Sequence, residues 1–220
     1  MEIQNTKIRS RNTIQVYTLG SHLGWRKEEK VPHYCFFSSE DSGVFGNGAV
    51  HWINLRESQK CDILAFGLAN EEFWPIPSPP YTNSFGANLC SKLTLLGGNL
   101  CVVHSNYQSI NKRLDIRAFK KTNNGNSQGE KTEKQREYDT WSWSKEHSIA
   151  WEVEVTYTPF VITKCSTVLL WENETSNLRC FDPRTSTLEK YWDGGERDSV
   201  YVQAVPHMNS LVSLKELGEI

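Results

Sequence analysis

The sequence predicts an all-β protein assembled from repeated antiparallel sheets, and three observations support this. Alanine, the strongest helix former, occurs only 7 times in 220 residues, whereas valine, isoleucine and threonine together supply 40. Eight tryptophans, eight tyrosines and nine phenylalanines add side chains that suit the half-buried surface of a sheet. The third observation is that the strand signals repeat at an interval of about 50 residues.

Four strand signals mark the repeat. Each copy opens with a short strand, at residues 14–19, 63–66, 114–119 and 178–181. In the first two copies a turn follows and leads to Trp25 and Trp74, which are 49 residues apart. In the fourth copy a turn at 182–185, with proline at its second position, leads to Trp192.

Hairpin signals lie between these strands. The three predicted hairpins cover residues 44–52, 93–103 and 160–171. Asn47-Gly48 and Gly97-Gly98 stand at the first two turns, where both residues must accept a positive φ. Lys164-Cys165-Ser166 stands at the third.

The interval between the second and third hairpins is about 20 residues too long, and residues 121–140 account for the excess. This segment has no leucine, isoleucine, valine or phenylalanine and interleaves acids with bases. We expect a flexible charged insertion between two strands of one unit, in preference to a basic nucleic-acid-binding segment.

Each repeat thus comprises a hairpin, a third strand, a turn and a fourth strand. Four antiparallel strands per period indicate a β-propeller of kelch-like spacing, in which the tryptophans lie between neighbouring sheets or, alternatively, line a ligand pocket. Residues 14–214 leave room for about four such blade-like sheets, so an incomplete propeller is expected. A polar segment (1–13) precedes it and a tail (215–220) follows it.

Composition argues against several classes of partner. The formal net charge is −2, which gives no electrostatic case for binding nucleic acid. No uninterrupted apolar run exceeds four residues, whereas a membrane span needs about 20. Six cysteines without a C-x-x-C pair, most of them within apolar runs, and no apolar leader after Met1 favour reduced, buried cysteines in a cytoplasmic or nuclear protein.

Catalytic and metal-binding motifs are not found in the sequence, so we expect no enzyme, no cofactor and no metal site. His51 and His104, 53 residues apart, could converge on a propeller axis and bind a metal. The simpler interpretation is that they occupy related strand positions. Glu71 and Glu72 are neighbours in a turn and are expected to point apart, which disfavours a catalytic carboxylate pair.

The proline-rich segment 75–85 is the candidate for protein binding. Prolines make it stiff and a poor strand, and they would present Tyr81 and Phe85 as aromatic anchors. The alternative is that both rings pack against the edge of a sheet.

Six motifs in this order resemble the plant F-box-associated interaction domain. They are Val16–Arg26 ("VYTLGS…WR"), Gly43–Trp52, Ile63–Pro77, Leu96–Cys101, Trp143–Glu146 and Tyr201–Leu214. The resemblance implies a module that captures a target protein for ubiquitination by an SCF-type ligase. The ligase adaptor would be bound only through a separate F-box, which this sequence is expected to lack.

Two alternatives accompany this interpretation: a truncated, non-functional paralogue and a kelch-like propeller enzyme. The sequence also departs from the family pattern at several places. Gly67 stands where the family has an aspartate able to cap the turn, Lys164-Cys165-Ser166 replaces an Asn-Gly tip, and the charged insertion is unusual. The first strands of the family domain are likewise expected to be missing.

Overall fold

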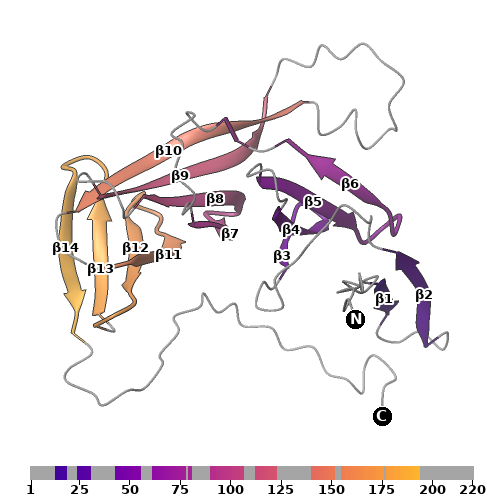
Figure 1. Ribbon diagram of the computed structural model, residues 1–220. Coiled ribbons are helices and arrows are strands. Elements are labelled where there is room, and N and C mark those ends of the chain that lie inside the picture. The colour runs from indigo at the N-terminus through magenta and orange to yellow at the C-terminus, as the bar shows by residue number, and fades with distance from the viewer. Residues whose placement is uncertain are drawn as a thin grey trace, which may run out of the picture. The chain divides into compact units, whose positions relative to one another are not determined.

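The protein is all-β in every part that the structure describes. The computed structural model describes residues 13–18, 24–30, 43–55, 61–77, 79–80, 90–106, 112–122, 140–151, 155–175 and 177–193 (Figure 1). These residues form strands, turns and connections without a helix, which confirms the predicted fold class. It follows that no helix capable of crossing a bilayer occurs among them.

The chain divides into two compact units. The first comprises Met1–Phe36 together with Met208–Ile220. Its described strands, β1 (Thr13–Tyr17) and β2 (Trp25–Lys30), form an antiparallel pair. Trp25 begins β2 and is 70% exposed, so the prediction that the recurrent tryptophans are buried between sheets is wrong for this residue.

The second unit, Phe37–His207, contains three antiparallel sheets of four strands each. Within each sheet the strands follow one another in chain order, which is the meander expected of a propeller blade. The first sheet contains β3 (Val44–Gly46), β4 (Ala49–Leu55), β5 (Cys61–Gly67) and β6 (Phe73–Ile76). The second contains β7 (Cys90–Leu96), β8 (Asn99–Asn106), β9 (Lys112–Lys121) and β10 (Trp141–Trp151). The third contains β11 (Tyr157–Ile162), β12 (Val168–Glu172), β13 (Asn177–Asp182) and β14 (Thr187–Trp192).

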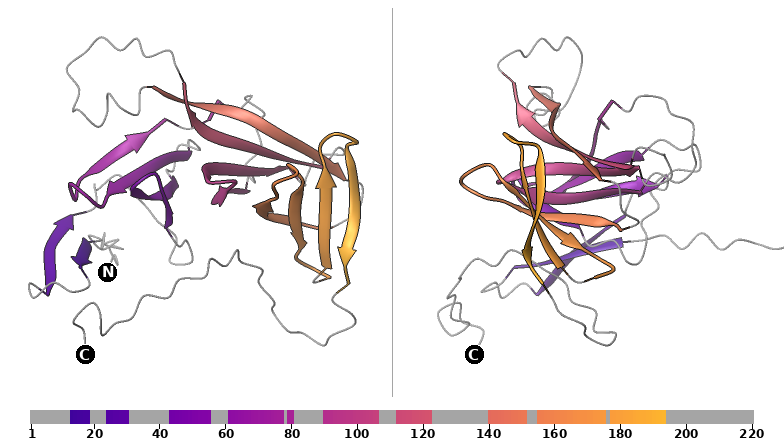
Figure 2. Two further views of the ribbon diagram at one scale, coloured as in Figure 1. Left: turned by 180° about the vertical axis from the view of Figure 1, so that it is seen from behind. Right: turned by 90° about the vertical axis from the view of Figure 1, so that its left-hand side faces the viewer.

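The sheet β7–β10 lies between the other two sheets, as the left view of Figure 2 shows. Within its described residues, the three four-stranded sheets make this unit an incomplete β-propeller. Each sheet combines one predicted hairpin with the strands that follow it, so the predicted order of elements within a repeat is confirmed.

The hairpin turns have the predicted backbone geometry. Asn47 and Gly48 have φ values of 53° and 74°, and Gly97 and Gly98 have 56° and 78°. Positive φ at both turn residues defines the type I′ turn, whose twist matches that of the flanking strands. The third hairpin turns without Asn-Gly, and there Ser166 takes the positive φ of 64°.

The charged insertion joins β9 to β10, two neighbouring strands of one sheet, as predicted. Residues 123–139 lie outside the described residues. At the base of the insertion, the backbone N–H and the hydroxyl of Thr122 both donate to the carbonyl of Thr140. Lys121, predicted to belong to the insertion, is instead the last residue of β9 and pairs with Trp141, so the strand ladder extends further than the prediction of 121–140 allowed.

Two apolar clusters lie between the sheets. The first joins β3–β6 to β7–β10 and includes Trp74, Leu100 and Phe119. The second joins β7–β10 to β11–β14 and includes Trp151 and Phe181. The predicted position of tryptophan between sheets is thus confirmed for Trp74 and Trp151, and Trp141 and Trp143 pack against the first cluster.

The tryptophan of the last strand does not follow this pattern. Trp192 on β14 is 49% exposed, and its ring stacks on Trp171 with 6.4 Å between ring centroids. It lies on the face of β11–β14 that is opposite the core cluster, so here too the prediction of a buried position is wrong.

The start of the proline-rich segment forms part of a strand, contrary to the expectation for residues 75–85. Pro75 lies in β6, opposite Leu64 of β5. Because β6 is the last strand of its sheet, one side of its backbone needs no ladder partner, and an edge strand tolerates proline for that reason.

Gly67, which departs from the family pattern, occupies a position with no room for a side chain. A Cβ at this residue would lie 2.3 Å from Oδ1 of Asn70 and 2.7 Å from the ring of Trp74. The turn is closed by backbone hydrogen bonds instead, from Gly67 N–H to the Glu72 carbonyl and from Glu71 N–H to the Gly67 carbonyl.

We therefore expect Gly67→Asp to lower the free energy of unfolding by about 1–3 kcal/mol, because Trp74 is only 5% exposed and must move. Urea unfolding measures the change. Ala69→Asp places the same charge at an exposed position of the same turn and is the control. A stabilising Gly67→Asp would instead support the aspartate cap inferred from the family pattern.

Candidate functional site

The two predicted interface residues, Tyr81 and Phe85, lie outside the described residues. The chain leading to them is held in place, because the indole N–H of Trp143 on β10 donates to the carbonyl of Pro77 at 2.6 Å. Pro79 is buried and Pro80 is exposed. The residues directly after β6 therefore lie beside the start of β10.

Exposed apolar side chains gather at the turn end of two neighbouring sheets. Phe45 and Leu95 each precede the turn of a hairpin and are 57% and 40% exposed. Leu68, in the turn between β5 and β6, is 45% exposed, and its N–H donates to the Gly48 carbonyl. We call these three the turn-end residues. Large exposed apolar side chains of this kind are typical anchors of protein interfaces.

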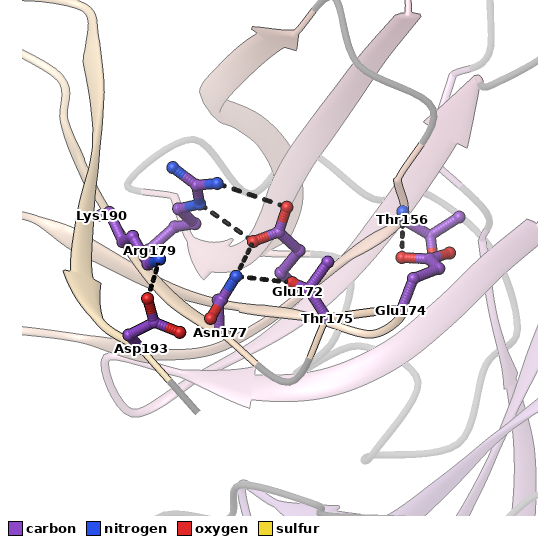
Figure 3. Close-up of polar contacts among 8 residues, drawn as sticks. All are labelled: Thr156, Glu172, Glu174, Thr175, Asn177, Arg179, Lys190 and Asp193. Carbon is purple, nitrogen blue, oxygen red and sulfur yellow. Dashed lines mark hydrogen bonds and ion pairs between the residues drawn. The ribbon is translucent and has the colours of Figure 1, made fainter. Parts of the chain in front are cut away.

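A polar cluster lies in the sheet β11–β14, at the end away from the hairpin turn that joins β11 to β12 (Figure 3). Its centre is the Glu172 carboxylate, whose side chain is only 4% exposed. Arg179 donates to both carboxylate oxygens, from Nε at 3.0 Å and from Nη2 at 3.4 Å. Asn177 donates to the same carboxylate at 3.2 Å and to Thr175 at 2.8 Å.

The cluster is electrostatically self-contained. Burial alone would raise the pKa of Glu172, but hydrogen bonds from Arg179, Thr175 and Asn177 outweigh it and lower the pKa. Around this centre, Glu174 accepts from the N–H and hydroxyl of Thr156, and Lys190 pairs with Asp193 (Figure 3). Every carboxylate drawn there already has a partner, which suits a structural role better than acid–base chemistry.

The histidines considered for metal binding and the glutamates considered for catalysis each have their own surroundings. His51 is fully buried, with Nδ1 3.2 Å from the Val44 carbonyl, whereas His104 stands opposite Asp115 in the β8–β9 register. In the part of the chain that the structure describes, no three metal-ligating side chains come together. Glu72 accepts a hydrogen bond from Asn70 at 2.9 Å, within its own turn.

The cysteines whose side chains the structure describes are reduced, as expected, but they are not all buried. Cys101, Cys165 and Cys180 are free thiols. Cys101 is fully buried, and burial raises its pKa to about 12, so it is an inert apolar residue. Cys165, at the third hairpin turn, is exposed, which differs from the expectation that the cysteines are buried.

His51 makes the stability of the fold sensitive to pH. Burial lowers its pKa, although the contact with the Val44 carbonyl opposes this, so the folded protein keeps the imidazole neutral. The unfolded chain takes up a proton below about pH 6.5, and stability must therefore fall as the pH drops below that value.

We expect the free energy of unfolding to be lower at pH 5.5 than at pH 7.5, with His51 contributing at most about 1.4 kcal/mol per pH unit. Urea unfolding of wild type and His51→Leu at both pH values checks this, because the substitution should reduce the difference. His147→Leu is measured alongside, because burial also lowers the pKa of that half-buried histidine, and the two variants show how much of the pH difference each histidine contributes. An unchanged pH difference in His51→Leu would contradict the assignment.

Comparison with known families decides what this fold is. A family model described as the F-box associated beta propeller domain matches residues 1–203. The chain belongs to this family. No curated protein and no solved structure gave a significant match.

The membership of the chain among F-box associated domains confirms the resemblance seen in the sequence and the propeller architecture. The family is one of protein-interaction propellers and not of enzymes. Within this F-box associated domain, sequence reasoning missed the turn-end residues and the Glu172 cluster. The former could have been found as large apolar residues beside hairpin turns, whereas the latter has no signal in a single sequence.

Proposed function

We propose that this F-box associated domain is the target-recognition module of an SCF-type ubiquitin ligase. It would bind the protein that is to be ubiquitinated, while a separate F-box contacts the ligase adaptor. Membership of the family over residues 1–203 is the observation that carries the proposal. Catalysis of transfer is assigned to other subunits of the ligase, and no cofactor or metal is required here.

The binding surface proposed for this role has two parts. Tyr81 and Phe85 follow the proline segment that the Trp143–Pro77 hydrogen bond holds beside β10. The turn-end residues Phe45, Leu68 and Leu95 provide apolar anchors on a rigid scaffold of hairpins. We infer a protein partner, and neither nucleic acid nor membrane, in the cytoplasm or nucleus, with a propeller of kelch-like spacing as the scaffold.

A chimeric ligase tests the proposal. The full chain is fused to an unrelated F-box, and ubiquitinated proteins are quantified by mass spectrometry of ubiquitin-remnant peptides under proteasome inhibition. We expect a defined set of proteins to be enriched over the F-box alone. The double variant Phe45→Ser/Leu95→Ser, and separately Tyr81→Ser/Phe85→Ser, should reduce that enrichment at least fivefold.

The matched control is Tyr191→Ser, which removes a ring that is 70% exposed on β14, in a different sheet from the turn-end residues. It should leave the enriched set unchanged. If the full chain enriches nothing, although circular dichroism shows it folded, the recognition role is wrong and the non-functional paralogue is favoured. Equal losses in the control and in the test variants would also contradict the proposed surface.

A further inference from the structure

Part of one face of the sheet β7–β10 carries more positive than negative charge. The same face continues into Val102 and Phe119, which belong to the cluster shared with β3–β6. On β9, Arg113, Asp115 and Arg117 alternate with buried Leu114 and Ile116, so the three charged residues share the other face of the strand. The register places His104 of β8 and Ser148 of β10 on either side of Asp115. Lys145 of β10 reaches the same carboxylate.

Among the residues that the structure describes, Asp115 is the carboxylate on this face, and it is already occupied. Ser148 donates to Oδ1 of Asp115 at 2.6 Å, and Nζ of Lys145 lies 3.0 Å from the same atom. Burial alone would raise the pKa of Asp115, but the hydrogen bonds from Ser148 and Lys145, together with the positive charges of Lys145 and Arg113, outweigh it and lower the pKa. Asp115 is therefore ionised at neutral pH and is paired with Lys145.

The two arginines are left without a salt bridge. Within the described ranges, neither Arg113 nor Arg117 forms an ion pair, and neither replaces Lys145 at Asp115. Arg113 is exposed and Arg117 is half-buried. Burial lowers the pKa of His104, so this imidazole is neutral at pH 7 and adds no positive charge to that of the arginines.

This arrangement defines the arginine face, which consists of Arg113, Arg117 and the Asp115–Lys145 pair between them. A guanidinium presents a planar fork of donors that matches the two oxygens of a carboxylate. The two arginines are four positions apart on the strand, a span of about 13 Å. Two carboxylates on one side of an extended peptide, at positions i and i+4, have the same separation.

We propose that the arginine face binds an extended acidic segment of the target protein, with carboxylates at i and i+4 and an uncharged residue at i+2. This rests on the proposed function, because the segment would belong to the protein captured for ubiquitination. The residue at i+2 faces Asp115 and Lys145, which already neutralise each other, so an acidic side chain there gains nothing. Trp143, two residues from Lys145 along β10, borders the site on the side of the proline segment.

A protein segment fits this face better than a nucleic acid does. Duplex DNA carries one negative charge per about 1.7 Å of its axis, so a site for it requires many closely spaced cations. The face offers two free cations, and the whole chain carries a net charge of −2, which repels a polyanion. Two widely spaced carboxylates match both the number and the separation of the free arginines.

Fluorescence anisotropy with the purified full chain tests the proposal. The probe is a labelled 11-residue peptide of serine, glycine and threonine with glutamates at i and i+4, compared with an isomer carrying them at i and i+1. We expect the i,i+4 peptide to bind at least fivefold more tightly. Arg113→Gln/Arg117→Gln should weaken its binding at least tenfold, and raising the salt concentration should weaken the wild-type complex.

The matched control is Lys92→Gln/Lys190→Gln, which removes the same amount of charge from positions outside the arginine face. It should change binding less than twofold. Equal affinity for both peptides, an equal loss in the control, or tighter binding of single-stranded DNA of the same length would each overturn the proposal.

Failure of this inference can be told apart from failure of the proposed function. If the chimeric ligase enriches targets and Arg113→Gln/Arg117→Gln leaves that enrichment intact, the arginine face is not the contact, although recognition stands. If the peptide result holds but the chimera enriches nothing, the face binds acidic segments and the ligase role is wrong.

Discussion

Replacing Phe119 with alanine is expected to lower the free energy of unfolding by about 3–5 kcal/mol. The ring is 1% exposed, and its centroid lies 5.5 Å from that of Trp141 and 4.9 Å from that of Trp143. It belongs to the cluster that joins β3–β6 to β7–β10, so its removal leaves a cavity between two sheets. Chemical denaturation followed by circular dichroism measures the loss.

Phe45→Ala is the control for this prediction. The same atoms are removed, but the ring is 57% exposed, so a change below about 0.5 kcal/mol is expected. Similar effects of the two substitutions would mean that the two sheets do not pack through Phe119. Phe119→Ala should also loosen the proline-rich segment, because Phe119 packs against Trp143, the residue whose indole holds Pro77.

Replacing Arg179 with methionine is expected to cost about 2–3 kcal/mol of stability at pH 7, somewhat less than a fully buried pair because Arg179 is 27% exposed. The substitution leaves the Glu172 carboxylate buried, with Asn177 as its remaining donor from the strand. Glu172→Leu should cost less, because the half-buried guanidinium that remains can still be hydrated on its exposed side. Urea unfolding of the two variants checks this order.

The double variant Glu172→Leu/Arg179→Met distinguishes the net stability contribution of the ion pair from the cost of leaving one buried charge without its partner. Replacing both charges with apolar groups of similar shape should cost clearly less than Arg179→Met alone. In the wild type, the lowered pKa of Glu172 gives stability that is present above about pH 4.5 and is lost as the pH falls. A double variant as unstable as Arg179→Met, or one that keeps the wild-type acid dependence, would contradict this account.

Much of the fold could be predicted because its signals are local. Asn47-Gly48 and Gly97-Gly98 mark hairpin turns that only residues tolerant of positive φ can form, and both hairpins formed where expected. The composition of residues 121–140 identified an insertion, and the 50-residue interval identified the sheets as copies of one unit. The turns and the insertion depend on a few neighbouring residues, and the interval can be read from the order of those local signals, so none of these features requires knowing how distant strands pair.

What could not be predicted depends on the pairing of distant strands. Trp25 lies 49 residues before the buried Trp74, and Trp192 ends the fourth copy of the repeat, yet both are exposed, because exposure depends on which face of which sheet each occupies. The Glu172–Arg179 contact joins adjacent strands in a register that a single sequence does not reveal. The arginine face does have a local signal, since charges alternate with Leu114 and Ile116, but its free cations become evident only once Lys145 is seen to occupy Asp115.

The bonds between Thr122 and Thr140 have a practical consequence for handling this protein. They close the β9–β10 ladder independently of what connects the two residues, and the entropy of closing a loop grows only slowly with its length. The connection between them is therefore a natural attachment point, where an epitope tag, a fluorophore-binding peptide or a small reporter domain can be inserted without rebuilding a sheet. Thr140 precedes Trp143 by three residues, so a reporter inserted before it is attached close in the chain to the residue that holds Pro77.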